Sequence, residues 1–515
     1  MITPPKNKFI TLVRDGKIVP LYREIQFFPP QLLYEYFAFP NTFLLESVKG
    51  PEKIARYSFI GYDPCLTFKV KNGLIEIEND ANSPSFTKNY IFSSKPLNVL
   101  KDFINSYRQR YIESLPPFQG GIVGVLSYDF VQYLERLPQN SIDDLQLPDA
   151  HFFVIDRLIA VDHLSKKGWI IVCPGVKEII KEERNYESID WSKKYDEAEY
   201  EIEKIFQRFA AAKKTVTTYH LQVKGDNPES SRIKNQQSKH KIEIIYEMKK
   251  KAYMDIVKRA KEYIAAGDIF QSNLSQRVSA YIRDKSPWSL YKILSAINPS
   301  PFAAFIDFGD YQIVSSSPER LLRVQNNRIE TRPIAGTRPR GKDTKEDELM
   351  RIELLLNEKE RAEHIMLIDL ERNDLGRISN YGSIGVDELM ITEDYSHVIH
   401  IVSNIRGVLA DGKDCFDAIK ASFPGGTITG VPKVRCMEII DELEPVRRGP
   451  YTGSIGYISF SGNMDLNIII RTFVIKDKMA YVQVGAGIVA DSDPEREYYE
   501  TLKKAEALIR TLEGV

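Results

Sequence analysis

The sequence predicts a mixed α/β protein built from more than one domain. Short runs rich in β-branched and aromatic residues are separated by Gly, Asn, Asp and Pro, the pattern of strands and turns. Charged amphipathic segments with helical spacing alternate with these runs. One strongly polar segment, residues 215–243, contains KGDNPESSRIKNQQSKHK and has few apolar residues. We therefore expect an N-terminal domain over 1–214, a polar linker over 215–243 and a second domain over 244–515.

The N-terminal part has more predicted strands than helices. Helices are expected near 32–37 and 97–111, and a charged amphipathic helix over 195–214. The predicted strands are FITLV, NTFLLES, RYSFIGY, CLTFKV, LIEIE, GGIVGVLSY, FFVIDRLIAV and GWIIVC.

The C-terminal part alternates between the two kinds of element. Helices are expected over 246–266, 288–297, 346–370, 413–423, 434–443 and 494–512. The stretch 346–370 contains no Gly or Pro, so a single unbroken helix is predicted there. Strands are expected in FQSNLSQRVSAYI, FAAFIDF and YQIVSSS, and over 397–402, 453–460, 467–474 and 479–484.

Composition narrows the class of protein. The 515 residues include 70 Lys and Arg against 71 Asp and Glu, a net charge of −1 that argues against bulk nucleic-acid binding. The chain opens without the apolar core of a signal peptide and has no apolar run long enough for a membrane span. The 4 cysteines are scattered and form no CxxC, so we expect buried free thiols in a reducing cytoplasm.

Two predicted helices each carry a pair of glutamates on one face. Glu360 and Glu363 are three residues apart, and so are Glu497 and Glu500, with Lys504 one turn beyond. One interpretation is a solvated face of intrahelical ion pairs. The other is a cradle of carboxylates around a divalent cation. Mg²⁺ suits such a cradle, whereas zinc is disfavoured because only one imidazole and no cysteine lie close by in sequence.

Two glycine-rich stretches and one arginine add to this picture. The stretches 423–430 and 485–487 are either tight turns or places where backbone N–H groups approach a ligand. Arg471 lies in the apolar run NIIIRTFVI, so a buried partner is required, either a structural carboxylate or a ligand. No P-loop, GxGxxG or GxSxG motif is present. These observations favour a cytoplasmic, Mg²⁺-dependent enzyme that acts on a small anionic molecule.

Longer motifs make the sequence recognisable as a member of a family. Those within 245–512 are GDIFQSNLSQR, SSSPERLL, TRPIAGTRPRG, NEKERAEHIMLIDLERNDLGRI, YSHVIHIVS, FPGGTITGVPKVRCMEIIDELEPVRRGPYTGSIGY and GAGIVADSDPEREYYETLKKA. This set resembles the chorismate-utilising enzymes. FLLES, RYSFIG and FQGGIVGVLSYD resemble the N-terminal domain of the large subunits (component I) of anthranilate synthase and aminodeoxychorismate synthase. The resemblance implies two packed β-sheets flanked by helices, with the active site in a cleft.

The resemblance also implies roles for individual residues. Glu319 would be the general acid that helps the ring hydroxyl leave, with Thr337 and Gly336 positioning that hydroxyl. His400 and Thr427 would line the ring. The substrate carboxylates would be held by Tyr451, Arg471, Gly485, Gly487 and Lys504, and Mg²⁺ by Glu360, Glu363, Glu497 and Glu500.

Gln271 bears on the nucleophile. In the related enzymes that add water to chorismate, the matching position resembles a lysine general base. A glutamine at position 271 cannot take a proton from water in this way. Ammonia needs no such base, so the resemblance implies amination, with ammonia supplied from glutamine by a separate amidotransferase subunit. The resemblance offers a further alternative at Ser47, which matches a tryptophan-pocket position, namely an amino-acid-sensing module with weak catalysis.

The product depends on smaller features. Asn273, Phe302, Thr429 and Asn467 resemble aminodeoxychorismate synthases, which make 4-amino-4-deoxychorismate for 4-aminobenzoate and folate. Ala335 departs from the PIKGT of many of these enzymes, whose lysine attacks the ring covalently. An alanine there is compatible with direct attack by ammonia, which would give anthranilate for tryptophan synthesis. We expect the 4-amino product, with anthranilate as the alternative.

Overall fold

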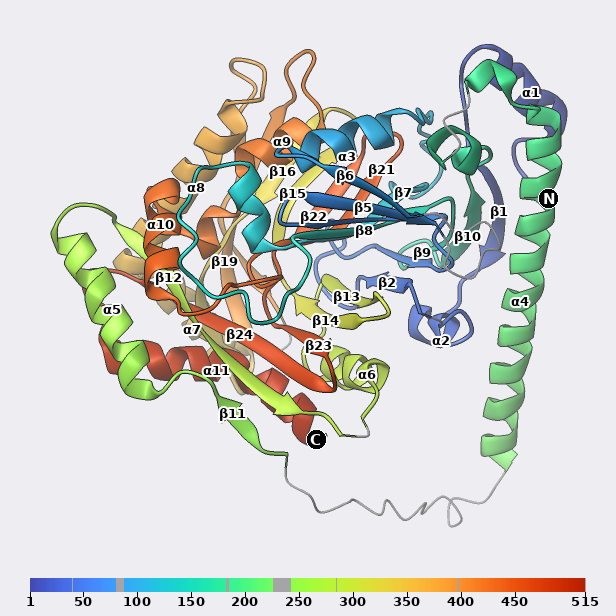
Figure 1. Ribbon diagram of the computed structural model, residues 1–515. Coiled ribbons are helices and arrows are strands. Elements are labelled where there is room, and N and C mark those ends of the chain that lie inside the picture. The colour runs from blue at the N-terminus through green and yellow to red at the C-terminus, as the bar shows by residue number, and fades with distance from the viewer. Residues whose placement is uncertain are drawn as a thin grey trace.

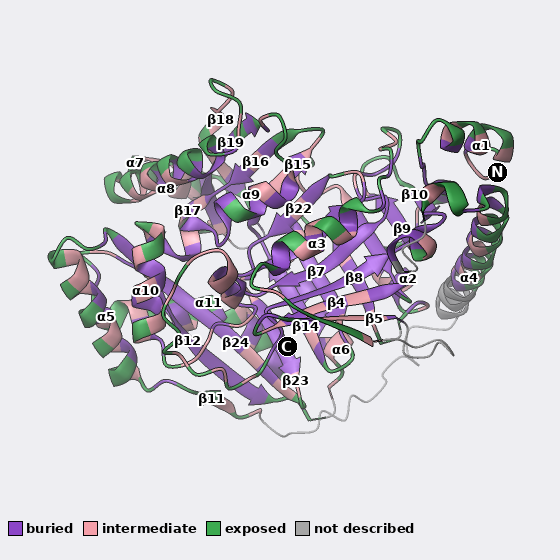
Figure 2. Cartoon of the chain, turned by 45° about the horizontal axis from the view of Figure 1, so that its top comes forward, coloured by how far each residue is buried: buried purple, intermediate pink, exposed green. Residues whose placement is uncertain are grey.

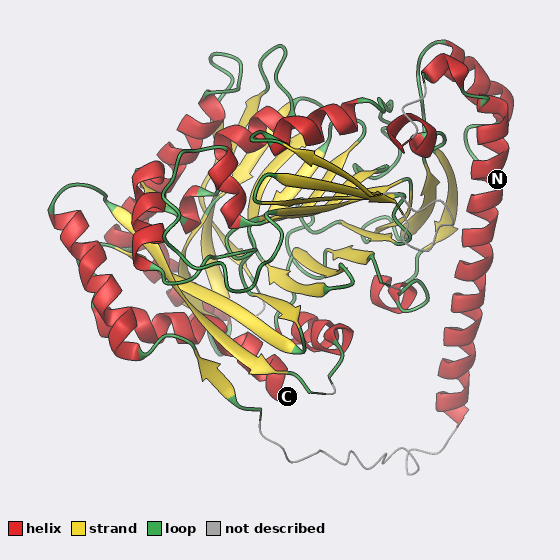
Figure 3. Ribbon diagram, viewed as in Figure 1, coloured by secondary structure: helices red, strands yellow, loops and turns green. Residues whose placement is uncertain are grey.

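Two large antiparallel sheets, packed face to face with helices outside, form the core of the molecule (Figures 1 and 3). The computed structural model describes residues 1–38, 40–79, 88–181, 185–225, 242–283, 285–395 and 398–514. Aromatic side chains join the two sheets: the Phe59 ring of one sheet lies 5.5 Å from the Tyr457 ring of the other. The expected α/β (α+β) fold of two packed sheets is confirmed.

The first sheet has 12 strands in the order β1-β10-β9-β3-β2-β13-β14-β23-β24-β12-β11, with β20 also paired to β12. Its strands are β1 (Leu21–Gln26), β2 (Thr42–Glu46), β3 (Tyr57–Gly61), β9 (Arg157–Asp162), β10 (Lys167–Val172), β11 (Ile244–Tyr246), β12 (Gln271–Tyr281), β13 (Phe302–Asp307), β14 (Tyr311–Ser317), β20 (Gly430–Val431), β23 (Thr472–Lys476) and β24 (Met479–Ile488).

The second sheet also has 12 strands, in the order β17-β19-β16-β15-β22-β21-β7-β8-β4-β5-β6, with β18 added on β19. Its strands are β4 (Leu66–Lys71), β5 (Leu74–Asn79), β6 (Lys88–Phe92), β7 (Gly121–Leu126), β8 (Ala150–Ile155), β15 (Arg320–Gln325), β16 (Arg328–Arg332), β17 (Ile334–Pro339), β18 (Gly385–Asp394), β19 (Val398–Val408), β21 (Ser454–Ser459) and β22 (Met464–Asn467).

Both sheets combine strands from before and after the polar segment. In the first sheet β2 pairs with β13, and in the second β7 pairs with β21. The helix α4 (Trp191–Gly225) packs on β1 and β10, and it continues past residue 214 into the stretch expected to be a linker. Residues 226–241 of that stretch lie outside the described part. The N-terminal and C-terminal parts therefore share one architecture, and the division into domains stays a prediction.

Helices cover the outer faces of the sheets. Figure 2 shows buried strands inside and helices with exposed outer faces. On the first sheet, α11 (Pro494–Glu513) packs against β24, α5 (Lys250–Ala265) and α6 (Pro287–Ile297). At the end of the second sheet, α7 (Thr344–Leu356) and α8 (Glu358–Gly376) contact β17 and β19. The other main helices are α1 (Lys6–Arg14), α2 (Pro30–Tyr34), α3 (Pro96–Asn105), α9 (Cys415–Ser422) and α10 (Lys433–Leu443). In the described part of the chain, no helix is long and apolar enough to cross a membrane.

Two predicted elements have a different secondary structure. FITLV forms part of helix α1 instead of a strand, because Phe9 and Val13, four residues apart, are both buried on one helical face. The helix predicted over 346–370 is two helices that meet at Asn357. The Asn357 side chain accepts a hydrogen bond from the Glu360 N–H, so it caps α8 and breaks the longer helix.

The strand predicted over 467–474 is also interrupted. Strand β22 ends at Asn467 and β23 begins at Thr472, so Arg471 does not lie inside a strand. Its backbone has φ of 52°, which no β-strand accommodates. The prediction failed because an apolar run indicates burial but not strand pairing. Ile468 and Ile469 are buried, and Ile470 is partly buried, without belonging to a strand.

Candidate functional site

The predicted site residues converge where the C-terminal strands of the two sheets approach α8 and α11. Gln271 begins β12, and Gly485 and Gly487 lie near the end of its partner β24. Ala335, Gly336 and Thr337 lie on β17, beside His400 on β19. The glutamates project from α8 and α11.

Neighbouring polar groups approach the backbone of β24 closely at two of its glycines. In the antiparallel register, Gly487 lies opposite Asn273. A Cβ added at Gly487 would lie 2.6 Å from Nε2 of Gln271, and one at Gly485 would lie 2.8 Å from Oη of Tyr451. The tight-turn interpretation is therefore wrong for these two glycines. They lie in a strand, where close approach by neighbouring polar groups excludes a side chain.

On α8, each glutamate of the pair has one carboxylate oxygen held by a donor. Gln271 Nε2 donates to Glu363 Oε1 at 2.7 Å. Arg338 Nη1 donates to Glu360 Oε1 at 2.6 Å, and the other oxygen of Glu360 is buried without a hydrogen-bond partner among the described residues. Gln271 therefore contacts the Glu363 carboxylate of α8 directly.

The glutamates of α11 have a different environment. Lys504 forms an ion pair with Glu500 at 2.8 Å and donates to the backbone oxygen of Gly485 at 3.1 Å. Burial raises the pKa of Glu497, an effect that Ser492 and the charge of Lys504 oppose. Lys504 thus places a positive charge against the backbone of β24 at Gly485.

The glutamate oxygens are of the type that Mg²⁺ prefers, but in the described part of the chain the four side chains do not lie close enough together to hold one ion. Carboxylate oxygens are the ligands that Mg²⁺ prefers, and the buried, unpaired Oε2 of Glu360 is suited to a cation. In the described residues, however, no group of three or more His, Cys, Asp or Glu side chains lies close enough to hold a metal ion. The binding of one ion by all four glutamates stays a prediction. Among the four, in the described residues, only Glu500 forms an ion pair within its own helix, with Lys504.

Glu319 is a buried carboxyl group at the junction between β14 and β15. Burial raises its pKa from 4.5 to about 7, an effect that Thr427, the Ile334 N–H and the charge of Arg471 oppose. The Ile334 N–H donates to Glu319 Oε1 at 3.4 Å, and the Ile468 N–H donates to its backbone oxygen at 3.0 Å. A carboxyl group with this pKa can carry a proton near neutral pH and give it to a substrate.

His400 is buried and neutral. Burial lowers its pKa to about 3. Its Nδ1 lies 2.9 Å from the Thr337 hydroxyl and 3.3 Å from the backbone oxygen of Gly336. Because a carbonyl oxygen can only accept, the second contact favours the tautomer with the hydrogen on Nδ1. Its Nε2 is buried and has no hydrogen-bond partner among the described residues. His400 can therefore accept a hydrogen bond from a ligand. Ala335, next to Gly336 on β17, is also buried.

Arg471 is a cation with no carboxylate partner among the described residues. Burial lowers its pKa, and Tyr395 and Glu319 are the groups that oppose this. No ion pair within 4.0 Å joins its guanidinium to a carboxylate in the described part of the chain, which favours a ligand over a structural ion pair. A planar guanidinium in this setting is suited to binding a carboxylate.

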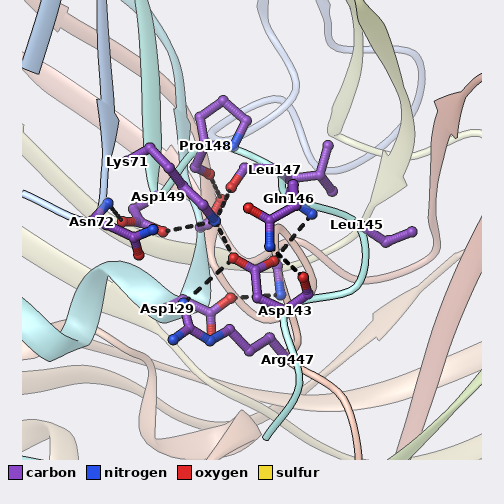
Figure 4. A network of polar contacts seen from close by, with 12 residues as sticks. Lys71, Asn72, Asp129, Asp143, Leu145, Gln146, Leu147, Pro148, Asp149 and Arg447 are labelled. Atoms are coloured by element: carbon purple, nitrogen blue, oxygen red, sulfur yellow. Dashed lines mark hydrogen bonds and ion pairs between the residues drawn. The ribbon is translucent and has the colours of Figure 1, made fainter. Parts of the chain in front are cut away.

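Asp129, which sequence reasoning missed, supports the turn that carries Tyr451. Its carboxylate accepts from the Gly449 N–H at 2.9 Å, and the Tyr128 N–H donates to the Gly449 oxygen at 2.7 Å. Figure 4 shows Asp129 beside Arg447, within a network of polar contacts that also contains Lys71, Asp143 and Asp149. No motif links residues 320 positions apart, so only the fold could reveal this support.

Ser47 lines a separate cavity of about 240 Å³ between the sheets. Its hydroxyl donates to the backbone oxygen of Pro301 at 3.1 Å. Charged side chains around the cavity include Lys53, Arg56 and Arg320. The 4 cysteines are buried free thiols, as expected.

Comparison with known proteins agrees with this geometry. The family model described as chorismate binding enzyme matches residues 41–510. Anthranilate synthase component 1 of Acetivibrio thermocellus is 41% identical over 100% of this chain and 99% of its own length. Aminodeoxychorismate synthase component 1 of Bacillus subtilis is 41% identical over 91% of each chain.

Solved structures give the same result. The crystal structure of anthranilate synthase component I from Streptococcus pneumoniae superposes with a TM-score of 0.70 at 35% identity, covering 88% of this chain and 92% of that chain. The menaquinone-specific isochorismate synthase of Escherichia coli, at 16% identity and a TM-score of 0.66, shares the fold over 99% of this chain and 100% of its own. The chain therefore belongs to the family of chorismate binding enzymes.

Proposed function

We propose that this enzyme adds ammonia to chorismate in a Mg²⁺-dependent reaction and that its product is 4-amino-4-deoxychorismate. The observation that carries the amination is Gln271. Its amide donates to Glu363 at 2.7 Å, so a neutral group lies where addition of water would require a base. Ammonia has its own lone pair and needs no proton removed before it attacks.

The ring hydroxyl leaves with the help of Glu319. Because burial raises the pKa of this carboxyl to about 7, it carries a proton in neutral solution and transfers that proton to the departing oxygen. The C–O bond breaks, water leaves, and the new C–N bond forms on the ring. The nitrogen then loses its extra proton. Thr337 and the Nε2 of His400 supply hydrogen-bonding groups beside this hydroxyl.

The carboxylates of chorismate are held by positive charge and N–H donors. The Arg471 guanidinium, the Lys504 ammonium, the Tyr451 hydroxyl and the backbone of Gly485 and Gly487 surround one face of the site. Mg²⁺ bound by Glu360, Glu363, Glu497 and Glu500 would neutralise the ring carboxylate.

Four residues support the 4-amino product by resemblance to aminodeoxychorismate synthases. Asn273 Oδ1 would lie 2.5 Å from a Cβ added at Gly485, and this closeness supports a place for Asn273 in the site. Asn467 donates to the backbone oxygen of Phe302 at 3.3 Å, and both residues line the cavity that contains Ser47. Thr429 donates to the Gly425 oxygen at 2.9 Å. For these three residues the support is the resemblance alone.

Anthranilate is the second candidate. Ala335 provides no nucleophile, so a covalent enzyme–ring intermediate cannot form there, and ammonia would attack the ring directly. More of the similar relatives carry the name anthranilate synthase component 1 than the name aminodeoxychorismate synthase component 1. The word component in these names supports a partner subunit, which would be an amidotransferase that releases ammonia from glutamine.

One incubation distinguishes the two products. The purified chain is mixed with chorismate, Mg²⁺ and ammonium, and the products are separated with and without an added lyase that cleaves 4-amino-4-deoxychorismate. The proposal expects 4-aminobenzoate only when the lyase is present. Anthranilate and pyruvate formed by the chain alone would support the second candidate, and unchanged chorismate would refute both. Calorimetry with tryptophan tests the sensing alternative at the Ser47 cavity, and no binding heat would exclude it.

A further inference from the structure

We propose that Arg338 is a positioning residue of the metal site, which fixes Glu360 so that one of its oxygens is free to bind the cation. This inference rests on the proposed function, because it assumes that Glu360 is a metal ligand. It concerns a residue that would touch neither the metal nor the substrate.

The Arg338 guanidinium is held by acceptors from three elements. It donates to Glu360 on α8 at 2.6 Å, to Glu353 on α7 at 3.0 Å and to the backbone oxygen of Thr337 on β17 at 3.0 Å. A planar guanidinium with several fixed partners has little freedom left. Arg338 therefore connects two helices to the strand that carries the predicted hydroxyl-binding residues.

The second oxygen of Glu360 points at an opening made by a glycine. Oε2 is buried and has no hydrogen-bond partner among the described residues. A Cβ added at Gly336 would lie 2.4 Å from it, and Gly336 has φ of 68°, which also favours glycine. A buried carboxylate oxygen without a donor is costly, so this arrangement indicates a cation that is added later.

Glu363 repeats the pattern. One of its oxygens accepts from Gln271 Nε2, as one oxygen of Glu360 accepts from Arg338. Metal-binding carboxylates are commonly oriented by such a donor on the oxygen that the metal does not use. In this site the two donors differ in charge, because Gln271 is neutral and Arg338 is cationic.

The charge of Arg338 raises the opposite possibility, that it competes with the metal for Glu360. Glu353 argues against competition. It forms its own ion pair with Arg338, so the charge of the guanidinium is balanced without Glu360. The negative charge of Glu360 is then left for the cation, and positioning outweighs repulsion.

Binding of Mn²⁺, measured by electron paramagnetic resonance on the full chain without chorismate, tests this inference. Arg338→Gln should raise the Kd for Mn²⁺ by about 10- to 100-fold, the usual effect of losing such an outer partner. Arg338→Lys should give an intermediate Kd, since a lysine restores one donor but not the fork. Arg351→Gln is the matched control, because Arg351 lies on α7, as Glu353 does, but pairs with Asp394, and the Kd of this variant should stay within about twofold of the unaltered value.

The outcomes separate the inference from the proposed function. If the unaltered chain binds Mn²⁺ and Arg338→Gln binds it equally well or more tightly, Arg338 does not position Glu360, and the inference alone fails. If the unaltered chain binds no Mn²⁺, the metal assignment and the inference both fail. Should Arg338→Gln not fold, Glu353→Gln removes one anchor of the guanidinium and should still raise the Kd several-fold. An unchanged Kd in that variant would also overturn the inference.

Discussion

The proton on Glu319 should control the alkaline limit of the reaction. Burial raises the pKa of this carboxyl from 4.5 to about 7, so the protonated, active form is complete at acid pH and is lost as the pH rises through 7. About half of the molecules carry the proton at pH 7, about one in eleven at pH 8 and about one in a hundred at pH 9. The turnover number should therefore fall about fivefold between pH 7 and pH 8 and about tenfold for each further pH unit.

Replacement of the residue gives the size of the effect. Glu319→Gln cannot donate a proton as an acid, so kcat should fall by about 10²- to 10⁴-fold, and the remaining rate should no longer decline between pH 7 and pH 9. The assay is consumption of chorismate with Mg²⁺. The concentration of free ammonia is held constant at each pH, because ammonium also titrates in this range.

Glu371 supplies a control. It is a second buried carboxyl nearby, and burial raises its pKa to about 8, with a further contribution from the charge of Glu319. Its carboxylate is hydrogen-bonded to Thr331 at 2.7 Å, and in the described part of the chain no hydrogen bond joins it to a predicted site residue. Glu371→Gln should keep the decline above pH 7. If that variant loses the decline, or if Glu319→Gln keeps it, Glu319 is not the acid and the reasoning is wrong.

Three substitutions test other parts of the structure. Gly487→Ala forces a methyl group against the side-chain amide of Gln271 and should lower kcat/KM at least about tenfold. The control Gly376→Ala, which has open space around it, should leave kcat/KM unchanged. Equal kcat/KM values for the two variants would contradict the close approach of Gln271 to the backbone of Gly487. Arg448→Met leaves the buried Glu444 unpaired and should lower the free energy of unfolding by about 3–5 kcal/mol in urea titration; a loss below about 1 kcal/mol would show that the pair is dispensable. Asp129→Ala removes the carboxylate that accepts from the Gly449 N–H in the turn before Tyr451. It should lower the free energy of unfolding by about 1–3 kcal/mol in urea titration and raise the KM for chorismate. An unchanged KM would show that the turn keeps its conformation without Asp129.

The sequence alone determined much of the architecture. Runs of β-branched and aromatic residues identified most strands, and the helices at 288–297, 434–443 and 494–512 agree with α6, α10 and α11 within a residue or two. Local periodicity suffices for such elements because each has one clear apolar face or a buried ladder. The spacing of the glutamates on α8 and α11 was likewise visible, since it depends only on helical geometry.

Only the tertiary structure decided how these elements combine. It placed strands from both parts of the chain in each sheet, held Gln271 against Glu363, left Arg471 without a carboxylate partner in the described residues, and brought Asp129 to the turn of Tyr451. Each of these depends on contacts between residues far apart in sequence, which no local pattern encodes. The helix break at Asn357 could have been predicted from the sequence, because an asparagine that caps a helix is a local signal. It was missed because the prediction of one unbroken helix relied only on the absence of Gly and Pro. Sequence thus determined which groups are available for catalysis, and long-range packing determined their burial, their partners and hence their proton affinities.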